Sequence, residues 1–365
     1  MLFSMLLFCT IYSNLEIKDV EIYQPIQRSE VIVRPDGHVL VLNFQEAKIL
    51  EFNEEGELLK TIGSKGKGPG EFSYPTDFFY MSNLLYVFDM LSTEISVFDE
   101  QGVFIKRVKF PKRGVRLTKS KTGWVYITQG FLDPEAKPEV AWVDDQFENM
   151  VILKTYTDPG YAEGMMVMSD GTKTVAKFSP LSARPETFSN SDGSRVYLVD
   201  PEKSIIDVID DAERKIVQTF DLGLKKIPFD VDWAEERLAE EKERSKGQIN
   251  VKIQTSWPDT FPAFRQSFFS PLGHIALNRW AGRPDKRNVP LFLDETGEEI
   301  QSKVSWEAHE RVMGRYGDNL WISIWDNEEE AAGLVLLPIS EVNQFIKDNP
   351  IEFDGRGGRS ISISM

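Results

Sequence analysis

Cysteine is almost absent from this chain of 365 residues. Cys9 is the only one, and it lies in an apolar stretch at the extreme N-terminus. The rest of the chain therefore forms no internal disulfide bond and offers no thiolate ligand to a metal ion. This absence excludes zinc fingers and scaffolds stabilised by disulfide bonds.

Basic residues are also in deficit. Lys and Arg number 42 against 58 Asp and Glu, which gives a net charge of -16 at pH 7. Such a charge repels the phosphate backbone of nucleic acids, so we expect no nucleic-acid partner. Two hydrolase signatures, G-x-S-x-G and H-E-x-x-H, are absent as well.

Hydrophobic runs are short. The apolar stretch from Leu2 to Tyr12 is below the roughly 20 residues that a membrane-spanning helix needs. It predicts a leader over residues 1–13 and an exported protein of the periplasm or envelope, with membrane association through the N-terminus only. Against a leader, its first residues lack Lys and Arg, and Phe8 stands where a lipoprotein signal has a small residue before cysteine. The alternatives are a buried first strand or a misassigned start, which leave the protein in the cytoplasm.

Aromatic residues, in contrast, are plentiful. The chain has 24 Phe, 10 Tyr and 8 Trp, and 41% of its residues are hydrophobic. This is ample material for a packed core, so we expect an ordered globular fold.

Two segments in the N-terminal third repeat one pattern of turns and short apolar strands. In this pattern Phe52 corresponds to Phe98 and Gly56 to Gly102, each pair 46 residues apart. A period in the forties with hairpin signals is typical of propeller blades. The two copies are residues 36–63 and 82–108.

Weaker copies follow, the clearest over residues 192–220, and bring the number to six. The last copy lacks an obvious outermost strand, whereas residues 15–23 form a strand left over at the other end of the chain. Pairing of the two would close a ring and remove its exposed sheet edges. The sequence therefore predicts an all-β fold, a six-bladed β-propeller closed by an N-terminal strand, as a single domain over residues 14–365.

One segment breaks the period of two. Residues 230–245 are rich in Glu, Lys, Arg and Ala, and predict a helical insertion at about residues 230–246 between blades four and five. Trp233, Ala234 and Leu238 form a narrow apolar stripe on this helix. A solvated surface helix and a lid over a binding mouth are the two interpretations.

The glycine-rich stretch GSKGKGPGEFSYPTDF, residues 63–78, raises the question of a phosphate-binding loop. Such a loop needs Ser or Thr after Gly-Lys and a helix directly beyond, but Gly66 and Lys67 are followed by Gly-Pro and strand-like residues. We interpret it as the linker between blades one and two. Its glycines supply positive φ angles, and Phe72 and Pro75 begin the next blade.

Residues 31–110 resemble the NHL repeat, with the glycine-rich entry, "YVFD", "ISVFD" and the "QG" turn. The later stretch "FPAFRQSFFSPLGHIAL", after a charged helix, resembles exported bacterial six-bladed propellers of uncharacterised function. The resemblance implies the fold and an envelope location, and it brings no agreed chemistry.

Histidines are too few and too scattered to predict a catalytic or metal site. Two of them occupy the same repeat position in different blades, so they are not expected to share a metal ion, and the third lacks a recognisable nucleophile beside it. We predict structural roles for His38 and His274, whereas His309 stands alone near Glu307 and Glu310, and the sequence does not show the proximity of the nucleophile and base that a triad would need.

Polar residues end the second strand of several blades. They predict either turn formation or a ring of oxygen ligands for calcium, the ion that such groups favour. Some sugar-lactone hydrolases with related six-bladed folds hold a metal in this general region, but their ligands come from the channel. We therefore expect no metal or other cofactor, with calcium as the alternative. The residues are Asp89, Asp200, Asp326, Asn43 and Asn278.

A basic run over residues 106–121 carries eight basic residues and no acidic one. Strand alternation places Arg107 and Lys109 on a solvated face. Two further cations of this run and two cations of the glycine-rich linker fall at equivalent crossings between blades. Equivalent crossings open on the same end of the ring. The four cations predict a site for an anionic ligand such as a carboxylated glycan, a phosphate group or an acidic peptide. These residues are Lys65, Lys67, Lys112 and Arg113.

A second candidate surface lies in the long loop of blade five. Arg279, Trp280 and Arg283 are of the types that dominate protein interfaces, although the Trp side chain is equally suited to packing between blades.

Together these features predict a non-catalytic binding or scaffolding propeller of the bacterial cell envelope, with a protein or anionic glycan or peptide as partner. The alternative is a metal-assisted hydrolase or lyase that uses the central funnel. A purely structural envelope protein is a third interpretation.

Overall fold

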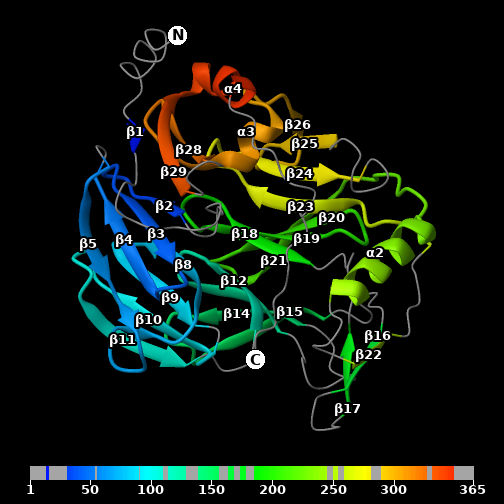
Figure 1. Ribbon diagram of the computed structural model, residues 1–365, viewed down its shortest axis with the longest axis horizontal. Helices are drawn as coiled ribbons and strands as arrows, with labels where there is room; N and C mark the ends of the chain where they lie inside the picture. The colour runs from blue at the N-terminus through cyan, green and yellow to red at the C-terminus, as the bar shows by residue number, and fades with distance from the viewer. Residues whose placement is uncertain are drawn as a thin grey trace. The chain divides into compact units, whose positions relative to one another are not determined.

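The computed structural model, drawn in Figure 1, describes thirteen segments of the chain. The chain divides into two compact units. One unit combines residues 1–65 with residues 302–365, and the other is residues 66–301. The described segments are 14–15, 31–53, 56–89, 91–109, 114–128, 139–155, 163–167, 173–177, 185–244, 250–253, 259–280, 289–326 and 331–348.

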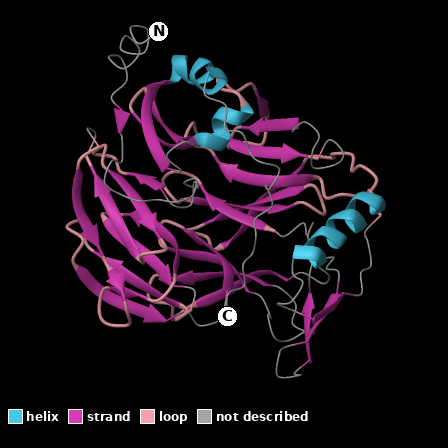
Figure 2. Cartoon of the chain, in the orientation of Figure 1, coloured by secondary structure: helices cyan, strands magenta, loops and turns pink. Residues whose placement is uncertain are grey.

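The unit of residues 66–301 contains four four-stranded antiparallel sheets among its described residues, each made of consecutive strands (Figure 2). The first is β8 (Pro75–Met81), β9 (Leu84–Asp89), β10 (Glu94–Phe98) and β11 (Phe104–Lys109). The second is β12 (Gly114–Lys119), β13 (Gly123–Thr128), β14 (Glu139–Asp144) and β15 (Met150–Thr155). The third is β18 (Glu186–Ser189), β19 (Arg195–Asp200), β20 (Ile205–Asp210) and β21 (Lys215–Asp221). The fourth is β23 (Phe264–Phe269), β24 (Ile275–Arg279), β25 (Val289–Leu293) and β26 (Glu299–Ile300).

The other unit contains two four-stranded sheets within its described part. One is β2 (Val31–Val33), β3 (Val39–Asn43), β4 (Lys48–Phe52) and β5 (Leu58–Ile62). The second joins β27 (Val312–Tyr316), β28 (Asn319–Asp326) and β29 (Ala331–Pro338) to β1 (Asn14–Leu15). Two helices that the sequence did not predict, α3 (Trp306–Arg311) and α4 (Ile339–Asp348), contact this sheet.

The N-terminal strand pairs with the last blade, as predicted. β1 runs antiparallel to β29, with Asn14 opposite Val335 and Leu15 opposite Leu334. It supplies the outermost strand that the sixth repeat lacks. The predicted strand continued to Tyr23, but residues 16–30 lie outside the described segments.

The sheets also confirm the repeat predicted from the sequence. Phe52 stands opposite Val39 in the first blade, and Phe98 stands opposite Leu85 at the same point of the second. With six four-stranded sheets in the described chain, each predicted blade has a counterpart.

The predicted helical insertion is present as α2 (Val231–Arg244), between β21 and β23. Asp230 caps it by accepting the Trp233 N–H at 2.9 Å. Ala234 is buried and Trp233 half-buried, as the apolar stripe predicts, while the side chain of Leu238 is not described.

Five short strands were not predicted. Three of them form a three-stranded sheet that is separate from the blades: β16 (Glu163–Val167), β17 (Lys173–Lys177) and β22 (Asn250–Ile253). β22 pairs with β16 across a long stretch of chain, and such non-local pairing has no local signal. The linker after β5 holds β6 (Ser64–Lys65) and β7 (Glu71–Phe72).

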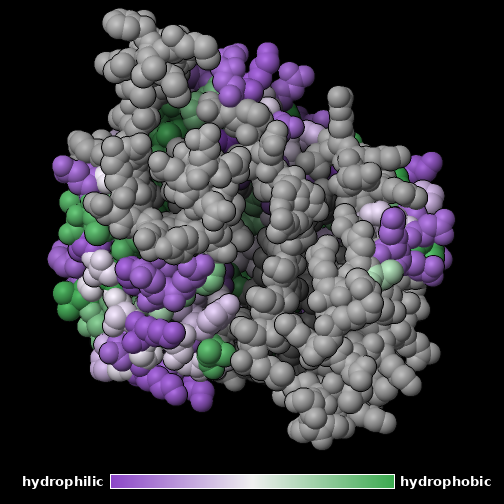
Figure 3. Space-filling model, viewed as in Figure 1, coloured by the Kyte–Doolittle hydropathy of each residue, from purple (hydrophilic) through white to green (hydrophobic). Residues whose placement is uncertain are grey.

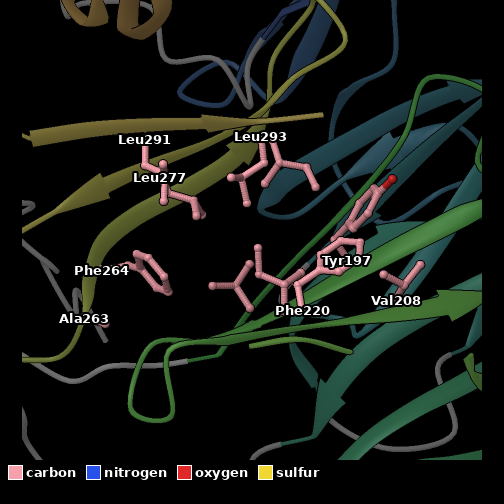
Figure 4. Close-up of a cluster of buried hydrophobic side chains, with 11 residues drawn as sticks. Tyr197, Val208, Phe220, Ala263, Phe264, Leu277, Leu291 and Leu293 are labelled. Carbon is pink, nitrogen blue, oxygen red and sulfur yellow. The ribbon is translucent and has the colours of Figure 1, made fainter. Parts of the chain in front are cut away.

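The hydrophobic core lies between neighbouring sheets. In Figure 4, apolar side chains of β19 to β21 and of β23 to β25 face each other. Tyr197, Phe220, Leu277 and Leu293 belong to this cluster, and each is less than 10% exposed. Strands buried on both faces explain the near-continuous apolar runs in the sequence.

The outermost strands share a bulge. In β5, β11, β15 and β21 one apolar residue has no partner on the neighbouring strand. Bulges distort the edge of a sheet and so discourage pairing with another chain. The four residues are Leu59, Ile105, Leu153 and Val217.

Candidate functional site

The glycines of the linker between blades one and two have two different roles. Gly63 and Gly70 have φ angles of 79° and 78°, which favour glycine. Gly66 and Gly68 do not have positive φ, so the prediction was wrong for them. They make room instead: a Cβ on Gly66 would lie 2.0 Å from Oε2 of Glu71.

The N–H groups of this linker are already used. Gly66 donates to the carbonyl of Phe72 at 2.9 Å, and Gly68 donates to Glu71 Oε2 at 2.7 Å. A phosphate-binding loop presents such groups to its ligand, and would not place a carboxylate on them. The structure therefore agrees with a linker and not with a phosphate cradle.

Arg107 of β11 holds the linker in place. Its guanidinium donates to the carbonyls of Lys67 at 3.1 Å, Gly68 at 2.7 Å and Glu71 at 2.7 Å, and its Nε donates to Ser96 Oγ at 3.3 Å. The prediction that this side chain lies on a solvated face was wrong. Strand alternation could not reveal it, because the acceptors lie about 40 residues away in the chain.

Asp89 ties the next turn to the same linker. One carboxylate oxygen accepts the N–H groups of Ser73 at 2.5 Å and Tyr74 at 3.0 Å. The other accepts those of Leu91 and Ser92, both at 3.1 Å. Four donors occupy this buried carboxylate, so it acts here as a turn former.

Two predicted ligand-binding lysines are exposed on this linker. The side chains of Lys65 and Lys67 both face solvent. Lys109 of β11 is exposed too, as the alternation predicts. Within the described residues, no carboxylate lies within 4.0 Å of the ammonium of Lys67 or Lys109. Lys112 and Arg113, at the next crossing, lie outside the described segments.

Lys119, near the far end of the basic run, is buried. Nζ of Lys119 donates to Asp145 Oδ1 at 2.8 Å and to two main-chain carbonyls at 2.7 and 3.1 Å. It also lies over the rings of Tyr86 and Trp124. Burial lowers the pKa of Lys119, and the charge of Asp145 opposes this shift. The basic run is therefore not one continuous surface.

The second candidate cluster is partly structural. The ring of Trp280 stacks on Phe261 with centroids 4.9 Å apart, and its Nε1 donates to the Phe264 carbonyl at 3.2 Å. Packing, the alternative considered for this Trp, is thus what the structure shows. Arg279 is half-buried, with Nε 3.4 Å from the Val289 carbonyl. Arg283 lies outside the described segments.

His38 belongs to a compact cluster of charged groups. Its Nδ1 lies 2.9 Å from Oε1 of the buried Glu51, which also accepts Arg34 at 3.1 Å. Lys60 pairs with the other oxygen of Glu51 at 3.1 Å. These contacts suit the predicted structural role, because they neutralise a buried carboxylate.

The other two histidines also pack internally. His274 contacts the ring of Phe292, and burial lowers the pKa of this imidazole. His309 is fully buried, with Nε2 at 2.6 Å from Ser302 Oγ.

Two of the other strand-end polar groups likewise bind nearby groups, whereas Oδ1 of the buried Asn278 has no hydrogen-bond partner among the described residues. Asn43 Oδ1 accepts the N–H of Glu46 at 3.0 Å, and Asp200 Oδ1 accepts that of Lys203 at 3.1 Å. The side chain of Asp326 is not described. In the part of the chain that is described, no three His, Cys, Asp or Glu side chains form a group suited to a metal ion.

Sequence reasoning missed the most exposed large apolar residue in the described part of the chain. Leu91, at the tip of the turn after Asp89, is 66% exposed. A leucine flanked by turn residues in "DMLSTE" is the signal that could have revealed it.

A comparison with known families supports the architecture. Residues 12–148 match the DUF5128 family, described as a 6-bladed beta-propeller. An exported-protein candidate from Bacteroides fragilis NCTC 9343 is similar over 87% of this chain and 92% of its own, with 13% identity and a TM-score of 0.50. The chain is a six-bladed β-propeller.

Other similar structures are more distant. A DUF4221 family member from Bacteroides vulgatus covers 86% of this chain and 94% of its own, at 11% identity and a TM-score of 0.46. An inactive variant of virginiamycin B lyase from Staphylococcus aureus, with quinupristin, covers 87% of each chain at 12% identity and a TM-score of 0.36. No curated protein matches the chain. At 13% identity, the likeness to the Bacteroides fragilis protein shows the propeller fold alone.

None of the helices in the described segments has the length and apolar character needed to cross a membrane.

Proposed function

We propose that this propeller is a non-catalytic binding or scaffolding protein of the bacterial cell envelope, which binds an anionic partner through the lysine-bearing linker between blades one and two. The observation that carries the proposal is the backbone of Lys67. Arg107 holds its carbonyl, so an exposed cation stands on a rigid base.

Rigidity matters because less conformational freedom is lost on binding. An ammonium group without a local carboxylate partner forms charge-assisted hydrogen bonds with carboxylate or phosphate oxygens. Lys65, two residues earlier, adds a second exposed cation. Lys112 and Arg113 extend the proposal to the next crossing, and Arg279 and Arg283 remain candidate contacts in blade five.

The envelope location rests on the predicted leader over residues 1–13. The likeness to an exported-protein candidate of the same fold supports it. An envelope partner of suitable chemistry would be a carboxylated glycan, a phosphate-bearing polymer or an acidic peptide.

The test is binding of the purified protein to immobilised poly-L-glutamate and polygalacturonate at low and high salt. We expect salt-sensitive binding that falls about 25-fold in the double variant Lys65→Glu/Lys67→Glu, at roughly 1 kcal/mol per lysine.

The matched control is Lys225→Glu, which reverses another exposed lysine and should bind as the wild type does. Equal binding of all three proteins would contradict the proposal. So would turnover of a small substrate that the double variant abolishes.

A further inference from the structure

Lys67 does not stand alone on blade two. Three exposed side chains belong to this blade and its linker: Lys67 on the linker, Leu91 on the turn between β9 and β10, and Lys109 at the end of β11. We name them the blade-two face. In Figure 3, hydrophilic and hydrophobic side chains lie next to one another over β10 and β11.

A short series of hydrogen bonds places the turn beside the linker. Ser73 donates its N–H to Asp89 at 2.5 Å and its hydroxyl to the Gly66 carbonyl at 3.3 Å. Asp89 in turn accepts the Leu91 N–H at 3.1 Å. The leucine and the neighbour of Lys67 are therefore connected through one serine and one aspartate.

Lys109 is connected to the same linker. It stands opposite Glu94 in the pairing of β10 with β11. Glu94 lies 3.7 Å from Nε of Arg107, which donates to the Lys67 carbonyl. Both lysines are thus connected to Arg107, Lys67 through its main-chain carbonyl and Lys109 through its strand partner Glu94.

The hydrogen-bond donors that remain on this face suit mobile anionic groups, such as lipid headgroups, better than a single fixed carboxylate. Specific recognition of a carboxylate favours the planar guanidinium of an arginine. The guanidinium of Arg107 already donates its hydrogen bonds to three carbonyls of the linker. The N–H groups of Leu91 and Ser92 donate to Asp89. What remains is one apolar side chain and two flexible ammonium groups, with the partly exposed carboxylate of Glu94 beside Arg107.

We infer that the blade-two face docks on the anionic surface of a lipid bilayer. Leu91 enters the boundary between headgroups and acyl chains, and Lys67 and Lys109 contact lipid phosphates. A chain with a net charge of -16 is repelled by such a surface as a whole, so local cations determine which side approaches it. This inference rests on the proposed function and names the partner of the same linker.

The test is co-sedimentation of the full chain with vesicles of phosphatidylglycerol mixed with phosphatidylcholine, against vesicles of phosphatidylcholine alone. The neutral vesicles measure any binding through the apolar N-terminus. We expect preference for the anionic vesicles, weakened about 25-fold in Lys67→Glu/Lys109→Glu. Leu91→Ser should weaken it about tenfold, because an inserted side chain is lost.

Two controls match these variants. Lys225→Glu reverses an exposed lysine elsewhere in the same unit, and Val217→Ser removes an apolar side chain that is 42% exposed on β21. Both should bind anionic vesicles as the wild type does. All altered residues are exposed, so loss of folding does not explain a difference.

Each outcome decides between the two proposals. Equal binding to both vesicle types, or unchanged binding of the variants, overturns the lipid inference. Binding to poly-L-glutamate that depends on Lys67, without binding to anionic vesicles, also overturns it and leaves the proposed function standing. Binding to neither probe overturns both.

Discussion

At the scale of single residues, the linker shows how cationic side chains take opposite roles. Arg107 and Lys67 are both cations of blade two, but the arginine is occupied by main-chain carbonyls whereas the lysine ammonium is exposed. Lys119 is a third case, buried with acceptors around it. Charge alone therefore does not identify a binding residue, and its hydrogen-bond partners do.

The first prediction concerns Arg107. Arg107→Ala should lower the free energy of unfolding by about 2 kcal/mol, since hydrogen bonds from a charged donor are lost while their carbonyl acceptors regain water. Arg107→Lys should recover only part of this, because an ammonium group cannot replace the planar fork. Urea unfolding measures both.

Lys109→Ala is the matched control on the same strand. Its side chain is exposed, so stability should change by less than about 0.5 kcal/mol. If Arg107→Ala were equally silent, the anchoring role of the guanidinium would be wrong.

At the scale of elements, two features depart from the regular blade: the bulges of the outer strands and the helix α2. The blades end in bulged outer strands, where Leu59, Ile105 and Val217 are between 42% and 50% exposed. The bulge limits pairing at these apolar edges. The helix α2 differs from the bulges, because a local residue at its N-terminus, the N-cap, marks where it begins.

Asp230 is that N-cap residue. Asp230→Ala should cost about 1 kcal/mol of stability, because the Trp233 N–H loses its acceptor at the first turn of α2. Asp230→Asn keeps an oxygen acceptor and should cost much less. Hydrogen exchange of the first helical amides, with urea unfolding, checks both variants.

Equal exchange rates in the alanine variant and the wild type would show that the cap does not hold this helix end. Loss of protection throughout the protein would instead show that α2 unfolds only with the blades.

At the scale of the whole molecule, the two functional classes differ in their need for a metal ion. Turn roles account for the side chains of Asp89 and Asn43 without a metal, and the second oxygen of Asp200 lies 3.8 Å from the ammonium of Lys154. A binding propeller of this kind has no requirement for calcium, while a metal-assisted hydrolase would be stabilised by its ion.

We therefore expect the melting temperature to be the same in calcium and in chelator. A site filled at a hundred times its dissociation constant would add about 2.7 kcal/mol, which is readily visible. A large shift, with one ion per chain by elemental analysis, would support the hydrolase and contradict the binding proposal. Magnesium at the same concentration is the control for general salt effects.

Much of the fold was predictable because its signals are local. Phe52 and Phe98 lie 46 residues apart at equivalent points of two consecutive blades. The alternating pattern around each of them is contained within its own blade. In the sheet of β16, β17 and β22, the pairing of β16 with β17 is local, but β22 comes from a distant segment and no local pattern predicts its pairing. Of the candidate site, Lys65 and Lys67 were predicted as exposed on a linker, whereas the role of Arg107 was not.

The order of the blades, the insertion of α2 and the exclusion of a phosphate loop follow from the sequence by itself. They depend on periodicity, capping and turn chemistry, which act over a few residues. Only the tertiary structure decided which cations are occupied and which are available. Arg107 finds its acceptors about 40 residues away, and Asp89 and Ser73 connect the N–H of Leu91 to the carbonyl of Gly66, the residue before Lys67. Such contacts depend on how distant segments pack, and no local pattern encodes them.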